Sequence, residues 1–168
     1  RAAPIVQDIV SGHLEHLMLS MPALEHRSLR DARAAVPGVT RVALVAPLTA
    51  VVAVRKTDDD EPRRIIEAML ADVYAKQVIV VDDDVDPNDL PRVLSAMALQ
   101  CQPADAVRIF HDMRGTPLDP SCTDPRGRSS KLGIDATRPL RPDREITRNR
   151  IPQDVLDGVD LAALLAKP

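Results

Sequence analysis

The segment that most constrains the fold runs from Gln77 to Leu90. It begins with the β-branched apolar run Val78–Val81, which stops abruptly at three consecutive aspartates, Asp82–Asp84. Apolar residues then recur at helical spacing, as Leu90, Val93, Leu94, Met97 and Cys101. This order predicts a buried strand, an acidic turn and an amphipathic helix. In open α/β folds, ligand sites gather at such turns, outside the carboxyl ends of the strands.

The composition limits the classes of function. A chain of 168 residues with 45% apolar residues fits one ordinary domain, but one Tyr, one Phe and no Trp require an aliphatic core. The shortage of aromatic side chains also argues against a single-stranded nucleic-acid binder. The net charge of −3, with interspersed signs, favours neither a nucleic-acid surface nor a membrane-binding face. No apolar run approaches the roughly 20 residues that span a bilayer, no signal peptide is visible, and the cysteines are too few for a disulfide scaffold. A cytoplasmic protein is therefore predicted.

The remaining elements follow from periodicity. Helical spacing predicts helices at about residues 14–21, 22–37 and 153–165, and one more that carries Ile65, Ile66, Met69, Leu70 and Val73. Short β-branched runs predict strands at Arg41–Ala46, Ala50–Arg55 and Ala106–Phe110, the first two as an antiparallel pair. Thr57 or one of the three aspartates after it is expected to cap the helix that follows. No period survives from His111 to Arg150, and so long an irregular stretch is usually functional or disordered.

This order of elements predicts an α/β fold. We expect a three-layer domain with a mixed β-sheet, helices on the sheet faces, and a long irregular C-terminal tail ending in a helix. The expected divisions are an extended segment at 1–12, an α/β core domain at 13–112, an irregular pocket or interface loop and tail at 113–150, and a C-terminal helix at 151–168. The chain begins with Arg1 rather than Met, which fits either a natural subunit or a fragment.

The acidic turn allows two interpretations. Asp82–Asp84 could bind Mg²⁺, and they resemble the Asp-x-Asp opening of haloacid-dehalogenase-type phosphatases, in which the first Asp attacks phosphorus. That motif normally continues with small residues, whereas Val85-Asp86-Pro87 follows here. Alternatively, Asp86 or Asn88 caps the next helix, with Pro91 in its first turn and the carboxylates complementing the helix dipole. Capping is the preferred interpretation.

Other candidate residues are less specific. His13 and His16 are spaced as a helical pair, but two ligands do not make a metal site, so surface histidines are preferred. The segment Arg114–Pro120 follows a strand and contains two prolines, which suits either a pocket wall or a simple chain reversal. Lys131 and Asp135 are expected to form an ion pair in the tail or to contact a partner. The sequence contains no Ser-His-Asp set, P-loop or dinucleotide fingerprint.

Several motifs, in this order, resemble the C-terminal domain of UbiD-type decarboxylases, the polyprenyl-4-hydroxybenzoate carboxy-lyase family. The likeness covers nearly the whole chain, and the ordered set is far more specific than any one motif. The matching stretches are Arg1-Ala-Ala-Pro-Ile-Val-Gln7, Glu15-His-Leu17, Ala34–Thr40, Lys76–Asp86, Cys101–Asp105, Gly115–Ser121 and Ser130–Pro139.

The resemblance implies a C-terminal-type subunit or fragment of a UbiD-like carboxylase/decarboxylase acting on aromatic or α,β-unsaturated acids. In the family, prenylated FMN, its divalent metal and potassium, and a Glu-Arg-Glu triad lie in a larger preceding domain. We therefore expect no catalytic, cofactor-binding or metal-binding residue in this chain. Its implied role is to close over a flavin site held by a larger UbiD-like catalytic subunit and to support oligomerisation, including self-association. By the motif match, Arg114, Thr116, Pro117 and Leu118 would line the substrate pocket.

Some positions depart from the family pattern. Ser95 stands where a Trp is usual, Gln100 replaces an Arg, and Val6 replaces a Tyr. These changes predict a specialised interface or a divergent subunit. Two alternatives stay open: an Mg²⁺-dependent phosphatase using the Asp82–Asp84 turn, and a non-catalytic assembly protein with the same fold.

Overall fold

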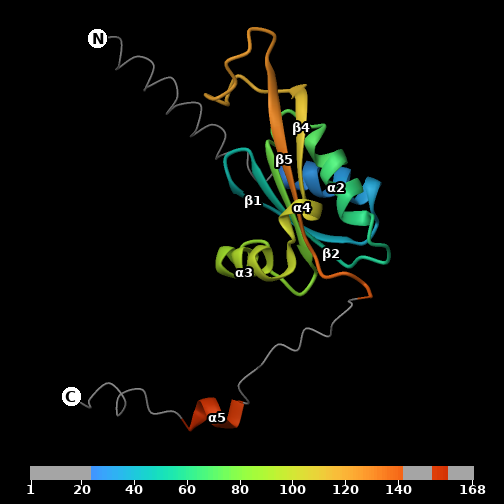
Figure 1. Cartoon of the computed structure of the whole chain (residues 1–168), viewed down its shortest axis with the longest axis vertical. Coiled ribbons are helices and arrows are strands. Elements are labelled where there is room, and N and C mark those ends of the chain that lie inside the picture. The colour runs from blue at the N-terminus through green and yellow to red at the C-terminus, as the bar shows by residue number, and fades with distance from the viewer. Residues whose placement is uncertain (1–23, 142–152, 159–168) are drawn as a thin grey trace, which may run out of the picture.

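The computed structural model describes residues 24–141 and 153–158, and in these residues the chain forms one five-stranded sheet (Figure 1). The strand order is β1-β2-β3-β5-β4. The strands are β1 (Val39–Ala46), β2 (Thr49–Val54), β3 (Gln77–Asp82), β4 (Val107–Arg114) and β5 (Arg128–Ala136). The helices are one at residues 24–35, α2 (Glu61–Leu70), α3 (Leu90–Gln100), α4 (Pro103–Ala106) and α5 (Gln153–Asp157).

The sheet is mixed, as predicted. Strands β2, β3 and β5 run parallel to one another in the centre. The edge strands β1 and β4 run antiparallel to their neighbours β2 and β5. The predicted antiparallel pair at Arg41–Ala46 and Ala50–Arg55 is thus confirmed as β1 and β2.

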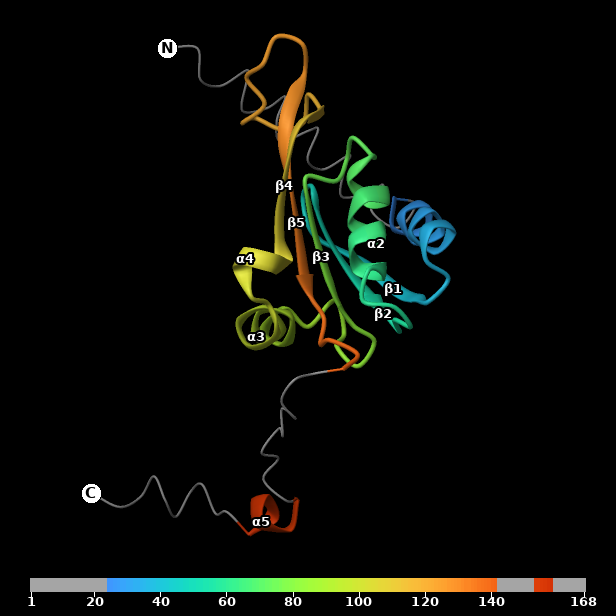
Figure 2. The ribbon, with the colours of Figure 1, turned by 45° about the vertical axis from the view of Figure 1, so that its right-hand side comes forward.

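Helices cover both faces of the sheet, which confirms the three-layer α/β fold (Figures 1 and 2). The helix at 24–35 and α2 pack on one face, and α3 packs on the other. Side chains of β2 and β3 alternate between the two faces, as the period of a strand requires. The first core contains Ala50, Val52, Val54, Val78 and Val80; the second contains Val51, Ala53 and Val81. The whole core is aliphatic, as the composition predicted.

The expectation that residues 113–150 are irregular is wrong for 128–136. These residues form β5, which lies between β3 and β4 inside the sheet. The predicted strand at Ala106–Phe110 also continues to Arg114. The loop from 115 to 127 therefore joins two long antiparallel strands, and we name it the hairpin loop.

One of the predicted aspartates lies at the N-cap of α2, whereas the N-cap of α3 differs from the prediction. Asp60 occupies the N-cap of α2 without a side-chain cap bond, while Thr57 instead donates its backbone N–H and hydroxyl to Glu61. At α3 the N-cap is Asp89, whose carboxylate accepts the N–H of Arg92 at 3.2 Å.

Several predictions fall outside the described residues. They concern the segment at 1–12, the helix at about 14–21 with His13 and His16, and most of the tail after 141; of the predicted terminal helix, the structure describes α5. Among the described residues, no helix has the length and apolar character needed to cross a membrane.

Candidate functional site

Two groups of polar residues lie at opposite ends of the sheet. Because β2, β3 and β5 are parallel, their carboxyl ends meet at one end, where Asp82 closes β3. Strand β4 runs the other way and brings Arg114 beside Arg128, at the start of β5. Figure 1 shows the hairpin loop projecting from that second end, away from α3. The acidic turn and the predicted pocket residues therefore belong to separate regions.

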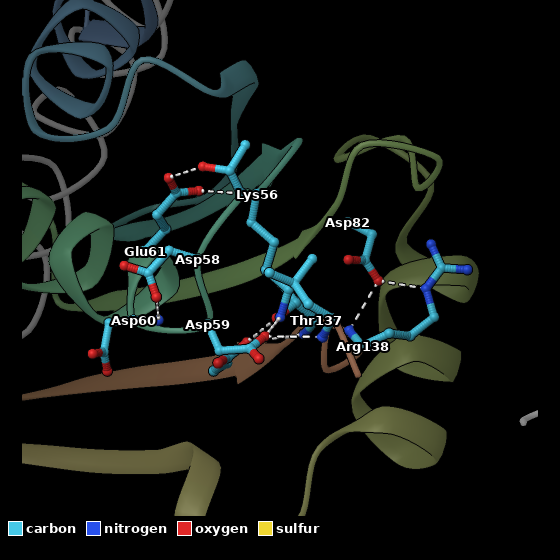
Figure 3. A network of polar contacts seen from close by, with 11 residues as sticks. Lys56, Asp58, Asp59, Asp60, Glu61, Asp82, Thr137 and Arg138 are labelled. Carbon is cyan, nitrogen blue, oxygen red and sulfur yellow. Dashed lines mark hydrogen bonds and ion pairs between the residues drawn. The ribbon is translucent and has the colours of Figure 1, made fainter. Parts of the chain in front are cut away.

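The first region is a network of charged side chains at the carboxyl ends of the parallel strands, drawn in part in Figure 3. We name it the carboxyl-end cluster. Its members are Arg55, Lys56, Asp59, Asp82, Asp83, Asp84, Thr137 and Arg138.

Arg138 holds one half of this cluster together. Its Nε lies 2.8 Å from Asp82 Oδ2, and its backbone N–H donates to the same oxygen at 3.0 Å. Its Nη2 donates to Asp84 Oδ1 at 2.8 Å, and Arg55 Nε donates to Asp83 Oδ2 at 2.6 Å. Partial burial lowers the pKa of Arg138, but the two carboxylates outweigh burial and leave that pKa above its ordinary value. All three aspartates of the acidic turn are thus bound by guanidinium groups.

Lys56 holds the other half together. Its Nζ donates to Asp59 Oδ1 at 2.7 Å and to Thr137 Oγ1 at 2.9 Å, and its side chain is only 5% exposed. Thr137 in turn donates to Asp135 Oδ1 at 2.7 Å. The hydrogen bond from Lys56, together with one from the N–H of Leu140, holds the pKa of Asp59 below its ordinary value. A shielded ammonium thus ties the segment after β2 to the segment after β5.

This geometry suits a structural charge network better than a nucleophile or a metal site. A nucleophilic carboxylate must be open to its substrate, but Asp82 accepts two hydrogen bonds from Arg138. In the part of the chain that the structure describes, no group of three or more His, Cys, Asp or Glu could hold a metal ion. The phosphatase alternative therefore has no support here. The preferred capping role of Asp86 or Asn88 is wrong as well, since Asp89 provides the cap.

The second region is the hairpin loop with the strand end before it. It brings the four predicted pocket residues together. Thr116 is buried, Leu118 is half-buried, and Arg114 and Pro117 are exposed. The hydroxyl of Thr116 accepts the N–H of Leu118 at 3.3 Å, so this hydroxyl is engaged inside the loop. That these residues face a substrate stays a prediction.

A buried carboxylate organises the inside of the hairpin loop. Asp119 Oδ1 accepts the N–H of Ser121 at 3.0 Å and its hydroxyl at 2.9 Å, and Asp119 Oδ2 lies 2.7 Å from Lys76 Nζ. Lys76 also donates to Ser121 Oγ. Partial burial raises the pKa of Asp119, but the hydrogen bonds from Lys76 and Ser121 outweigh it, so the pKa lies below its ordinary value.

A β-bulge in β4 directs the end of the β4–β5 ribbon. The register shifts between Phe110 and Met113, and Asp112 has a positive φ of 55°. Arg128 forms a bidentate ion pair with Asp112: its Nε donates to Oδ1 at 2.9 Å and its Nη2 donates to Oδ2 at 2.9 Å. This bidentate pair keeps a backbone conformation that a non-glycine residue rarely adopts.

The expected ion pair between Lys131 and Asp135 is wrong. Lys131 is buried and donates to two backbone carbonyls at the end of α2, those of Leu70 at 2.8 Å and Asp72 at 2.5 Å. Asp135 accepts instead from the N–H and hydroxyl of Thr137. The lysine therefore joins β5 to α2.

Residues 17–136 match the family described as 3-octaprenyl-4-hydroxybenzoate carboxy-lyase C-terminal domain, UbiD_C. The chain belongs to this family. The family is one of carboxy-lyases, and the resemblance found in the sequence motifs is confirmed.

Full-length UbiD relatives are considerably longer than this chain. Anhydromevalonate phosphate decarboxylase from Aeropyrum pernix is 38% identical over 149 residues, which cover 86% of this chain and 34% of that protein. The UbiD-class enzyme HmfF from Pelotomaculum thermopropionicum, solved with FMN, has a TM-score of 0.75 at 36% identity over 89% of this chain and 34% of that chain. The chain thus spans about a third of the length of these relatives.

A third UbiD relative has been solved in two states. Vanillic acid decarboxylase from Sedimentibacter hydroxybenzoicus matches in an open form with a TM-score of 0.65 at 28% identity, covering 82% of this chain and 31% of that chain. Its closed form matches with a TM-score of 0.64 at 26% identity, and the match covers 83% of this chain and 31% of that chain.

Among its described residues, this UbiD-family chain contains no group that could hold the flavin's metal. Their acids at the carboxyl end of the sheet are paired with arginine or lysine, and no metal-binding group forms among them. A cavity lined by Leu24, Leu44, Leu48 and Tyr74 measures about 20 Å³, whereas ligand pockets measure roughly 300 Å³ or more.

Proposed function

We propose that this chain is the C-terminal-type subunit, or a fragment, of a UbiD-like carboxylase/decarboxylase, and that it closes over a prenylated-FMN site held by another chain. The observation that carries the proposal is the family match over residues 17–136, in a chain that spans about a third of the length of its decarboxylase relatives. The matched decarboxylases are about three times longer, which leaves room for such a site in the part that this chain does not match. The divalent metal and potassium would accompany the flavin.

The proposed share of this chain in the reaction is positioning. Of the residues that would face the acid, Arg114 ends strand β4 and Thr116–Leu118 lie on the hairpin loop that follows it, at the end of the two-stranded ribbon of β4 and β5. Holding a substrate in a reactive orientation and excluding water can supply a large part of a rate enhancement without any proton transfer by the chain itself. The open and closed forms of the vanillic acid decarboxylase support a hinge motion as the means of closure.

The proposed substrates are aromatic or α,β-unsaturated acids, and the proposed partner is a larger UbiD-like subunit. Exposed apolar side chains on α3 and β4 support a contact surface for that partner or for a second copy of the chain. They are Leu90, Leu94 and Leu99 on α3 and Ile109 on β4. Analytical ultracentrifugation of the full chain tests self-association, and a single monomeric species at high concentration would contradict it.

We expect the purified 168-residue chain to be inactive alone, because the groups that hold the flavin are proposed to lie elsewhere. Supplied with prenylated FMN, a divalent metal and potassium, it should neither retain the flavin after gel filtration nor release CO₂ from vanillic acid or anhydromevalonate phosphate. Affinity capture from the native source followed by mass spectrometry should recover a larger UbiD-like chain, and the complex should decarboxylate. Turnover by this chain without a companion would contradict the proposal.

A substitution in the hairpin loop separates a pocket role from pure assembly. Pro117 is exposed, so Pro117→Trp should leave the fold intact while obstructing the proposed pocket, and kcat/KM of the complex should fall about tenfold or more. Pro125→Trp is the matched control, because Pro125 is also exposed in the same loop but lies outside the predicted pocket set. Equal kinetics for both variants would favour the non-catalytic assembly protein.

We also propose a cytoplasmic location. Both cysteines of the chain, Cys101 and Cys122, are free thiols in the structure, which supports a reducing compartment. Cell fractionation with an antibody against the chain tests this, and recovery outside the cytoplasm would contradict it.

A further inference from the structure

Lys76 occupies a backbone position that is fixed on both sides. It directly precedes β3, its N–H donates to Leu48 O at 2.8 Å, and its carbonyl accepts the N–H of Leu132 at 2.8 Å. The first contact reaches the turn before β2, and the second reaches β5. The Cα of Lys76 is therefore held by the central sheet, and its side chain projects from a rigid base.

The side chain of Lys76 binds the hairpin loop at its most buried carboxylate. Asp119 has a side chain only 6% exposed, and that of Lys76 is 27% exposed. The 2.7 Å ion pair between them is therefore less screened than a surface pair, and it is reinforced by the Ser121 hydroxyl that both residues contact.

Asp119 transmits this anchorage to the predicted pocket residues. Its N–H donates to Thr116 O at 3.0 Å, and its carbonyl accepts the N–H of Cys122 at 3.0 Å. The loop is closed at its base by the N–H of Gly115, which donates to Gly127 O at 2.8 Å. The segment Thr116–Leu118 therefore sits between two fixed points, the loop base and the Lys76–Asp119 pair. Releasing one of them leaves the segment free to change conformation.

We propose that Lys76 and Asp119 are positioning residues that lock the hairpin loop and thereby hold Thr116–Leu118 in the shape that receives the acid substrate. This inference rests on the proposed function, because it assigns a supporting pair to the same pocket. Neither residue touches substrate; the pair acts through the loop. A reactive geometry must be held closely, and displacement of a pocket residue by about 1 Å can cost up to about a hundredfold in rate.

The test compares Lys76→Met, Lys76→Arg and Asp119→Asn in the full chain, alone and in the complex with its companion. In the chain alone, Lys76→Met should raise the hydrogen-exchange rates of the Gly115, Asp119 and Cys122 amides about tenfold, with exchange in β2 and β3 unchanged. In the complex, kcat/KM for vanillic acid or anhydromevalonate phosphate should fall about tenfold while flavin content stays at the wild-type level. Lys76→Arg keeps the positive charge, so the exchange rates of the loop amides and kcat/KM of the complex should both stay close to the wild-type values.

A second ion pair in the same loop provides the matched control. Arg126 Nη2 lies 2.9 Å from Asp124 Oδ2 on the exposed side of the loop, so Asp124→Asn removes a charge of equal size without touching the anchorage. It should leave both exchange and kinetics at the wild-type level. If Asp124→Asn and Asp119→Asn lowered kcat/KM equally, loop charge rather than anchorage would be responsible, and the proposal would be overturned.

Other outcomes are also decisive. If Lys76→Met loosened the loop but left kcat/KM unchanged, the positioning role would be refuted while the proposed function stood. If it left the loop amides protected, the anchorage itself would be refuted. A wild-type complex without any turnover would instead contradict the proposed function, and the exchange data would still decide whether the anchorage exists.

Acid pH gives an independent readout of the same pair. The pKa of Asp119 is lowered in the folded chain, so its stabilising contribution is complete above the unfolded value of about 3.9 and is lost as pH falls through the folded value. The other carboxylate of the loop, Asp124, is also titrated only in strong acid, because hydrogen bonds from Arg126 bring its pKa to about 2. Acidification below pH of about 4 should therefore lower the protection factors of the loop amides in the wild type, that is, raise their exchange rates relative to an unfolded chain at the same pH. In Asp119→Asn these protection factors should already be lowered at neutral pH and should change little on acidification, and a wild-type acid response in that variant would overturn the role of Asp119.

Discussion

A Gly133→Ala variant should unfold at clearly lower urea concentration than the wild type, with a loss of about 3 kcal/mol in the free energy of unfolding. A Cβ atom at this position would lie 2.2 Å from Ile66 Cγ2 and 3.3 Å from Ile66 Cδ1. Ile66 is 1% exposed and packs from α2 onto the sheet, so it has no free space to move into. The added methyl group must therefore push α2 away from β5.

A double variant tests whether Ile66 is the cause. Ile66→Ala removes the two atoms closest to the new Cβ, Cγ2 and Cδ1, at a cost of about 2–5 kcal/mol on its own. The double variant Gly133→Ala/Ile66→Ala should lose at least about 1 kcal/mol less than the sum of the single losses. Gly127→Ala is the control for glycine loss in general: its φ is +68° but no atom lies within 4 Å, so only about 1 kcal/mol of backbone strain is expected. Additive losses in the double variant would show that the steric argument is wrong.

The elements that the sequence predicted well are those whose residues carry a clear period. The β-branched runs of β1, β2 and β3 become strands with buried side chains, and those of β2 and β3 face both cores. The apolar residues of α2 and α3 recur at helical spacing because each helix buries one side against the sheet. Long-range pairing decided the rest. Which strand neighbours which depends on contacts between residues far apart in sequence, and no local pattern states them.

Strand β5 was not predicted from the sequence because polar residues and a glycine occupy its alternate positions. Leu132, Ile134 and Ala136 alternate with Lys131, Gly133 and Asp135, so a period of two was present. The polar residues and the glycine on the alternate positions made the segment resemble a loop. The structure explains them: Gly133 leaves space for α2, and Lys131 reaches the end of that helix.

The two candidate regions differ in how far sequence reasoning reached. The acidic turn was correctly placed after β3, but its arginine partners come from Arg55 and Arg138, which only the parallel register brings near. In the hairpin loop, the residue types of Asp119-Pro120-Ser121 are typical of an Asx turn, so this local hydrogen bonding could have been predicted from the sequence. The ion pair between Lys76 and Asp119 could not have been predicted, because no rule of sequence spacing links a residue before β3 to a loop after β4.

Lys131→Met should lower the free energy of unfolding by about 2–3 kcal/mol. The lysine is 3% exposed, and its ammonium donates to Leu70 O and Asp72 O, where α2 ends and its carbonyls lack helical partners. Methionine fills similar volume but leaves the buried carbonyl of Leu70 without that donor. Asp135→Asn tests whether the stability instead comes from an ion pair between Lys131 and Asp135. Asparagine keeps the side-chain oxygen that accepts from Thr137, so this variant should lose under about 1 kcal/mol in the free energy of unfolding. Equal losses for the two variants would favour the ion pair.

The pH dependence of the Lys131→Met effect follows from the burial of this ammonium. Burial lowers the pKa of Lys131, so between the folded value and the unfolded value of about 10.4 the unfolded chain binds more protons than the folded chain. Stability contributed by this group therefore rises with pH across that window. The difference in unfolding free energy between the wild type and Lys131→Met should be constant near neutral pH and should widen as pH approaches about 10. Urea unfolding at several pH values measures this difference. If the difference narrowed over this range, the hydrogen bonds from the ammonium to the carbonyls of Leu70 and Asp72 would outweigh burial and the pKa would be raised instead.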